Sequence, residues 1–128
     1  MSSVPTLNGP IAIVDDDAGV RRALGRLLRV HGFEVVTHES GVEFLESAQL
    51  HDVECLILDM HMLGMSGVAV LEEVKVAATK LPVVLMTGRY DVDFAQRSLD
   101  AGASAFLRKP FGEDELLRAI ETAIGVRR

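Results

Sequence analysis

The sequence predicts one α/β domain, built on a parallel sheet with helices on both faces. Short apolar runs rich in β-branched residues recur roughly every 20 to 30 residues, and segments with helical periodicity separate them. This rhythm implies right-handed strand–helix–strand crossovers, which give parallel strands. The runs are apolar throughout instead of alternating, so both faces of the sheet should be covered. A chain of 128 residues, 48% of them hydrophobic, is long enough for one such core and too short for two.

Five strands are expected, each a short apolar run. They span residues 11–14, 34–37, 55–58, 82–86 and 105–107. The lone cysteine, Cys55, begins the third run, where its thiol should act as a small buried hydrophobic group. A single cysteine permits no internal disulfide, which fits a reducing compartment.

The first two helices are marked by their apolar spacing and by capping residues. The first repeats Val20, Ala23, Leu24, Leu27 and Leu28 at helical intervals, with Arg21 and other arginines on the remaining arc. Asp17 is its expected N-cap, and His31-Gly32 ends it. The second begins at Ser40, where Glu43 stands at capping-box spacing.

The last three helices differ in the strength of their apolar faces. The third carries Val68, Leu71, Val74 and Ala78, and the fifth carries Leu116, Leu117, Ile120, Ala123 and Ile124. The fourth, about Asp93 to Asp100, offers only Ala95 and Leu99 as an inner pair, so it should be held least firmly. Residues 1–9 are expected to be a loose lead-in, and residues 10–128 to form the domain.

The composition excludes several classes of function. Thirteen basic and nineteen acidic residues give a formal net charge of −6, which disfavours direct binding of nucleic acid. The apolar runs are far shorter than the roughly 18 residues that a membrane span requires. The first residues lack the basic and apolar regions of a secretory signal, so a cytoplasmic location is expected.

Polar and charged side chains follow four of the five expected strands. Asp15, Asp16 and Asp17 follow the first run, Asp59 the third, Thr87 the fourth and Lys109 the fifth. The carboxyl ends of parallel strands meet at one edge of a sheet, where ligands bind. Crowded carboxylates raise one another's pKa, and a divalent cation relieves the repulsion. Oxygen ligands without His or Cys suit Mg²⁺, which is the expected cofactor.

The balance of charges at this edge indicates which kind of reaction it can support. Mg²⁺ and Lys109 together would balance Asp15, Asp16 and Asp59. Conversion of Asp59 to an acyl phosphate adds negative charge, which Lys109 and Thr87 can neutralise. The edge therefore favours phosphoryl transfer to a carboxylate.

These residues lie within a series of short motifs. The motifs are Ile13-Val14-Asp15-Asp16, Leu58-Asp59-Met60 with Met62 and Gly67, Met86-Thr87-Gly88, and Ala101-Gly102-Ala103 leading to Lys109-Pro110-Phe111. In this order and spacing, they resemble the receiver domain of bacterial two-component response regulators, over about residues 10 to 125. The run 87–91, with 106–111, further resembles the nitrogen-fixation type of regulator. The resemblance implies a (βα)₅ flavodoxin-like fold with a five-stranded parallel sheet of order 2-1-3-4-5.

The resemblance also implies roles in phosphoryl transfer. Asp59 matches the phosphoacceptor, and the donor is a sensor histidine kinase or a phosphotransfer protein. Asp15 and Asp16 match the acidic pair that binds Mg²⁺, and the backbone carbonyl of His61 is a further ligand. Lys109 matches the lysine that contacts the phosphoryl group, and its bond to Pro110 is expected to be cis.

A second set of implied roles concerns the response to phosphorylation. Thr87 matches the switch hydroxyl and Phe106 the switch aromatic. Movement of Thr87 toward the phosphate lets Phe106 turn inward, which remodels the surface of helix 4, strand 5 and helix 5. That surface controls an output domain or partner, and it also offers a face for a homodimer. The domain is a switch more than an enzyme, with self-catalysed phosphoryl transfer and hydrolysis only.

Two features depart from the usual pattern or add to it. Leu63 stands where a proline is common, which removes a fixed φ from the loop after Asp59. His61 and Arg89 flank the expected phosphate position. We hypothesise that these two side chains shield the acyl phosphate from water and lengthen its lifetime.

Other interpretations of the sequence are weaker. A phosphorylation-independent interaction domain would keep the fold with an idle pocket, but the full set of polar residues argues against it. A phosphatase of the haloacid-dehalogenase type would use the Asp15-x-Asp17 spacing, yet Gly19 stands where Thr or Val is needed, and there is no room for a cap domain. A dinucleotide-binding fold would need Gly-x-Gly-x-x-Gly after the first strand, and the sequence lacks it.

Overall fold

Strands and helices alternate along the chain in the predicted order. The computed structural model describes residues 9–88 and 92–126. The strands are β1 Ile11–Val14, β2 Val35–His38, β3 Cys55–Asp59, β4 Val83–Thr87 and β5 Ala105–Arg108. The helices are α1 Ala18–Val30, α2 Gly41–Glu46, α3 Gly67–Ala77, α4 Val92–Asp100 and α5 Glu113–Val126, and the 3₁₀ turn η1 Ala48–His51 follows α2.

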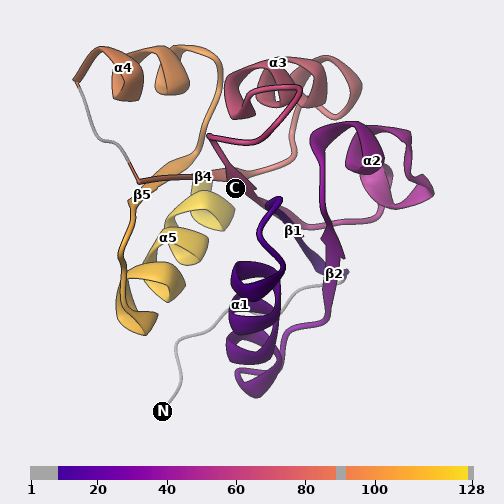
Figure 1. The fold of residues 1–128 in the computed structure, drawn as a ribbon, viewed down its shortest axis with the longest axis vertical. Helices are drawn as coiled ribbons and strands as arrows, with labels where there is room; N and C mark the ends of the chain where they lie inside the picture. Colours follow the sequence, from indigo (N-terminus) through magenta and orange to yellow (C-terminus); the bar gives the residue numbers. More distant parts are fainter. Residues whose placement is uncertain (1–8, 89–91, 127–128) are drawn as a thin grey trace.

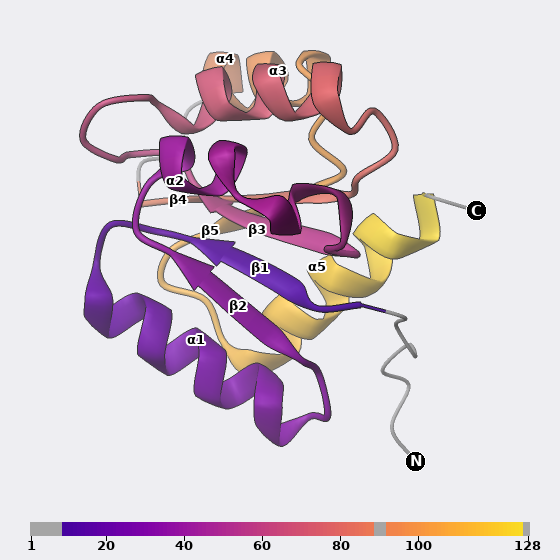
Figure 2. The same cartoon turned by 90° about the vertical axis from the view of Figure 1, so that its right-hand side faces the viewer.

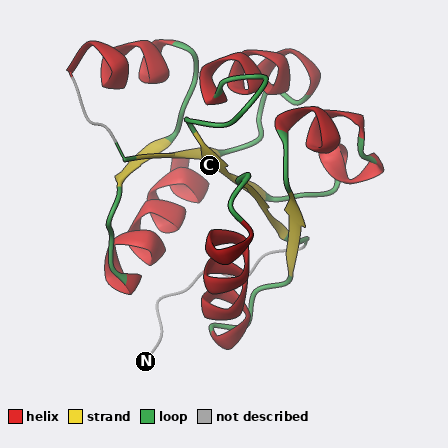
Figure 3. Ribbon diagram, viewed as in Figure 1, coloured by secondary structure: helices red, strands yellow, loops and turns green. Residues whose placement is uncertain are grey.

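The five strands form one parallel sheet of order β2-β1-β3-β4-β5 (Figures 1 and 3). In Figure 2, α1 and α5 lie on one face of this sheet, and α2, α3 and α4 lie on the other. The predicted flavodoxin-like fold and strand order are therefore confirmed. β1 lies between β2 and β3, so the ends of β1 and β3 are neighbours at the carboxyl edge.

The core is two apolar layers separated by the sheet. Alternate strand residues contribute to each layer. Toward α1 and α5 the strands bury Ile11, Ile13, Cys55, Ile57, Val84 and Met86. Toward α2 and α3 they bury Ala12, Val14, Leu56, Leu58, Val83 and Leu85. This two-sided burial explains why β1, β3 and β4 carry continuous apolar runs instead of alternating apolar and polar residues. It also raises the pKa of the Cys55 thiol to about 12, so that the thiol stays protonated.

The ends of the helices follow the predicted capping signals. Asp17 is the N-cap of α1, and its Oδ1 accepts from the backbone N–H groups of Gly19 and Val20. Ser40 is the N-cap of α2, and its Oγ accepts from the N–H of Glu43. Beyond the end of α1, Gly32 has a φ of +90°, a conformation that favours glycine.

Two predicted inner positions are wrong. Leu99 of α4 is 51% exposed, and Ala23 of α1 is also exposed. Ser98 of α4 is fully buried instead. It precedes Leu99 by one position, which places it about 100° away around the helix. The apolar pattern of this short helix could not reveal a buried hydroxyl. Within residues 9–88 and 92–126, no helix is both long and apolar enough to cross a bilayer.

Gly67, the first residue of α3, lies so close to the end of β3 that there is no room for a side chain. A Cβ at this buried position would lie 2.6 Å from the Cα of Met60 and 2.7 Å from the backbone oxygen of Asp59. We expect Gly67→Ala to destabilise the protein by about 1–3 kcal/mol in urea unfolding, because backbone atoms must shift.

The matched control for this change is Gly125→Ala in α5. Its added Cβ would meet no atom within 4 Å, so this variant should keep or raise the stability, by about 0.4–1 kcal/mol at most. Equal stability of the two variants would contradict the packing described for Gly67.

Candidate functional site

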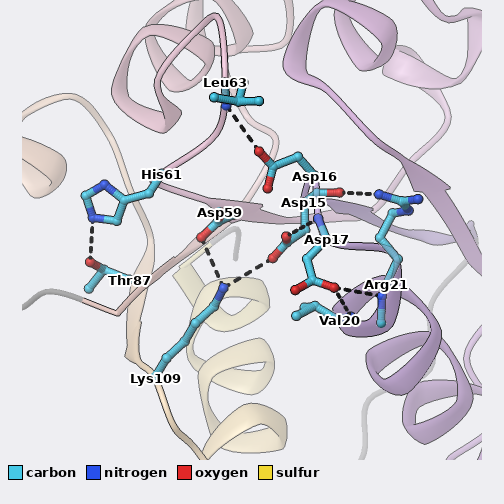
Figure 4. Close-up of polar contacts among 11 residues, drawn as sticks. Asp15, Asp16, Asp17, Val20, Arg21, Asp59, His61, Leu63, Thr87 and Lys109 are labelled. Atoms are coloured by element: carbon cyan, nitrogen blue, oxygen red, sulfur yellow. Dashed lines mark hydrogen bonds and ion pairs between the residues drawn. The ribbon is translucent and has the colours of Figure 1, made fainter.

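The carboxyl ends of β1, β3, β4 and β5 bring the predicted polar residues to one edge of the sheet. Asp15 follows β1, Asp59 ends β3, Thr87 ends β4 and Lys109 follows β5. Figure 4 shows Asp15, Asp59 and Lys109 pointing toward one another. The structure thus assembles side chains that are up to 94 residues apart in sequence.

Lys109 links the two buried carboxylates of this edge. Its Nζ donates to Asp15 Oδ2 at 3.3 Å and to Asp59 Oδ1 at 3.2 Å. Asp15 is 1% exposed and Asp59 is 4% exposed. The backbone N–H of Lys109 donates to the carbonyl of Thr87 at 2.6 Å, which ties the end of β5 to β4. The Lys109–Pro110 bond is cis, as the resemblance implied.

The electrostatics of the site follow from burial and from the crowding of charges. Burial and the neighbouring Asp15 raise the pKa of Asp59, although the ammonium of Lys109 and a backbone hydrogen bond at His61 oppose the shift. Burial works against the charge of Lys109, but Asp59 and Asp15 outweigh it and raise the pKa of Lys109. The lysine therefore stays charged, and Asp59 is held in surroundings that disfavour its ionised form.

Asp16 completes a group of three carboxylates. One carboxylate oxygen from each of Asp15, Asp16 and Asp59 lies within 4.8 Å of the others, and Asp16 is exposed. A hard divalent cation suits such a set of oxygens, because its charge offsets the repulsion among the carboxylates. The residues therefore fit Mg²⁺. Ligation by the backbone carbonyl of His61 stays a prediction.

Asp15 is oriented by two contacts that are not part of the predicted site. Its Oδ1 accepts from the backbone N–H of Asp17 at 2.9 Å. Its backbone carbonyl accepts from Arg21 Nη1 at 2.7 Å. The helical spacing predicts Arg21 only as part of the arc left by the apolar residues of the first helix and does not predict this contact. The side chain is in fact 18% exposed, and its acceptor is a backbone carbonyl, which no residue type in the sequence signals.

Thr87 and His61 form a second contact at the same edge. Thr87 is fully buried, and its Oγ1 lies 3.2 Å from His61 Nε2 (Figure 4). Phe106 of β5 is half-buried and packs against the apolar layer on the α2 and α3 side. Arg89, predicted to flank the phosphate with His61, lies outside the described residues.

Comparisons with known proteins agree with this geometry. A family model described as the response regulator receiver domain matches residues 11–121. The chain is 34% identical over 116 residues to the transcriptional regulatory protein FixJ of Azorhizobium caulinodans, covering 91% of this chain and 55% of FixJ. It is 39% identical over 114 residues to the response regulator protein TodT of Pseudomonas putida, covering 89% and 50%. A crystal structure of a response regulator receiver domain protein from Clostridium thermocellum superposes with a TM-score of 0.83 at 32% identity, covering 93% of this chain and 96% of that one.

The extent of these matches shows which part of the relatives this chain resembles. It spans about half the length of FixJ and of TodT, and nearly all of the Clostridium receiver domain. The family match includes Asp15, Asp16, Asp59, Thr87 and Lys109. The chain belongs to the response regulator receiver domain family.

Proposed function

We propose that this protein is a phosphorylation-activated receiver, which takes a phosphoryl group from a histidine kinase or phosphotransfer protein onto Asp59. The observation that carries the proposal is the position of Lys109, whose ammonium lies within hydrogen-bond reach of both Asp59 and Asp15. A buried carboxylate beside a fixed cation is suited to receive a group that brings additional negative charge.

The proposed reaction is an exchange of bonds at phosphorus. A carboxylate oxygen of Asp59 bonds to phosphorus while the phosphorus–nitrogen bond of the donor phosphohistidine breaks. The donor ring carries a proton on its other nitrogen, takes the electron pair of the broken bond and leaves as neutral imidazole. The raised pKa of Asp59 marks a carboxylate whose charge is poorly stabilised in the resting site. Lys109 then balances the charge of the transferred group. Self-catalysed transfer and hydrolysis are the only chemical steps proposed.

Asp15 and Asp16, with Asp59 and the carbonyl of His61, are the proposed Mg²⁺ ligands. When bound, Mg²⁺ supplies positive charge to the phosphoryl oxygens. The contacts of Asp15 with Lys109 and with the N–H of Asp17 orient its carboxylate toward the site.

Thr87 and Phe106 are the proposed switch. Movement of the Thr87 hydroxyl from His61 toward the phosphoryl group would let Phe106 turn inward and change the α4–β5–α5 surface. This surface would control an output domain or a partner protein, and it is the proposed face of a homodimer. FixJ is named as a transcriptional regulatory protein, and this chain covers about half of it, so a transcriptional output would belong to another part of such a protein.

The first test of this proposal is covalent modification. After incubation with acetyl phosphate and Mg²⁺, the intact mass of the wild-type protein should rise by one phosphoryl group, and Asp59→Asn should stay unmodified. Asp17→Asn is the matched control, because Asp17 caps α1 and should leave modification intact. An unmodified wild-type mass would instead favour a phosphorylation-independent interaction domain.

A second test uses stability in the absence of metal. Because burial and Asp15 raise the pKa of Asp59, removal of its charge in Asp59→Asn should raise the thermal midpoint at neutral pH by a few degrees. The gain should shrink as the pH falls through the raised pKa, since the wild-type carboxyl then becomes neutral in the folded state. Calorimetric unfolding between pH 7 and pH 4 would check this, and a loss of stability at neutral pH would contradict it.

The third test concerns the lifetime of the acyl phosphate. If His61 and Arg89 shield the phosphate, replacement of both by Ala should speed dephosphorylation, by about tenfold for each 1.36 kcal/mol of barrier lost. His51→Ala is the control, because this exposed histidine lies in the 3₁₀ turn before β3, away from the site. An unchanged rate in the double variant would refute the shielding role.

A further inference from the structure

The loop between β3 and α3 makes a contact that its side chains do not explain. The side chain of Leu63, in this loop, is 89% exposed and packs on little of the protein. Its backbone N–H donates to Asp16 Oδ2 at 3.1 Å, across 47 residues of sequence (Figure 4). The structurally important part of residue 63 is therefore its main chain.

Backbone hydrogen bonds fix both ends of the loop that carries this N–H. The N–H of Gly67 donates to the carbonyl of Met60 at 3.0 Å, and the N–H of Met60 donates to Met86 of β4 at 2.9 Å. Directly after Leu63, Gly64 adopts a φ of +86°, which favours glycine and turns the chain back toward α3. The ends of the loop are thus fixed to the sheet, and Leu63 is held at its turn.

Asp16 differs from the other two carboxylates in how it is held. Asp15 and Asp59 are buried and contact Lys109, whereas Asp16 is exposed. Within residues 9–88 and 92–126, the amide of Leu63 is the hydrogen-bond donor to the Asp16 side chain. An exposed carboxylate loses rotational freedom when it binds a ligand, and a donor that fixes it in advance reduces that loss.

We propose that the backbone N–H of Leu63 is a positioning group for Asp16. It holds one carboxylate oxygen and leaves the other free for a divalent cation. This inference rests on the proposed function of the acidic group. A proline at position 63 has no N–H and cannot make the contact, so this part of the site depends on a non-proline residue there.

The experiment removes the donor without changing the side chain. Incorporation of the α-hydroxy acid analogue of leucine at position 63 replaces the amide by an ester, and Leu63→Pro removes the same N–H with natural residues. Leu63→Ala keeps the N–H and is the matched control. Mg²⁺ titration of the full chain, without a phosphoryl donor, should show binding about two- to tenfold weaker for the ester and for Leu63→Pro, because the cation must then order the Asp16 side chain itself. Leu63→Ala should bind as the wild type does.

The same ester in an Asp16→Ala variant tests whether the amide of Leu63 acts through Asp16. In Asp16→Ala, the ester should produce no further loss of Mg²⁺ affinity, as followed by amide chemical shifts up to high Mg²⁺ concentration. A further loss there, or equal affinity of the ester and the wild type, would overturn the positioning role alone. Absence of Mg²⁺ uptake by the wild type would overturn the proposed cation site, and this inference with it.

Discussion

The arrangement of this protein's site depends on one lysine held between two buried carboxylates. Asp15 and Asp59 end neighbouring strands and are almost fully buried, so their charges would repel strongly without a cation between them. Lys109 supplies that charge from β5, which lies two strands from β3. A lysine side chain is long enough to cross β4, and the hydrogen bond of its backbone N–H to Thr87 fixes the point from which it reaches. The strand order is thus a condition for the site.

The covered sheet explains why polar groups gather at this edge. Both faces of the strands are filled by apolar layers, and alternate residues of every central strand contribute to each layer. A charged side chain within the strands would meet one of these layers and lose its hydration. Asp15, Asp59 and Thr87 lie where the strands end, and there backbone N–H groups and loop side chains can compensate their burial. The fold therefore limits a polar site to the ends of the strands, and the parallel arrangement places four of those ends together.

Features that residue type signals could be predicted from the sequence, whereas three that depend on a backbone group or on position around a helix could not. The strands and the shared edge could be predicted because apolar runs and the polar residues after them are visible in the sequence. Leu99 was placed inward because it is apolar, whereas Ser98 is the buried residue. The helical spacing predicts Arg21 on the arc left by the apolar residues of α1, yet its side chain donates to the backbone of Asp15. The contact of Leu63 with Asp16 involves an amide that every residue except proline carries, so no residue type could signal it.

The resting contacts also limit how much any single group could contribute to the proposed switch. A neutral hydrogen bond contributes about 0.5–1.5 kcal/mol and one to a charged group about 1.5–3 kcal/mol. Exchange of His61 for a phosphoryl oxygen as the partner of Thr87 would therefore gain on the order of 1–2 kcal/mol. Conversion of a population from about 1:99 to about 99:1 in favour of the active state requires about 5.5 kcal/mol. In the proposed switch, the hydroxyl alone cannot supply this, so a charge placed on Asp59 would have to act through several groups at once. The arrangement around Lys109 provides for this, because the same carboxylate is linked through one ammonium to Asp15, and through the backbone of Lys109 to the strand that carries Thr87.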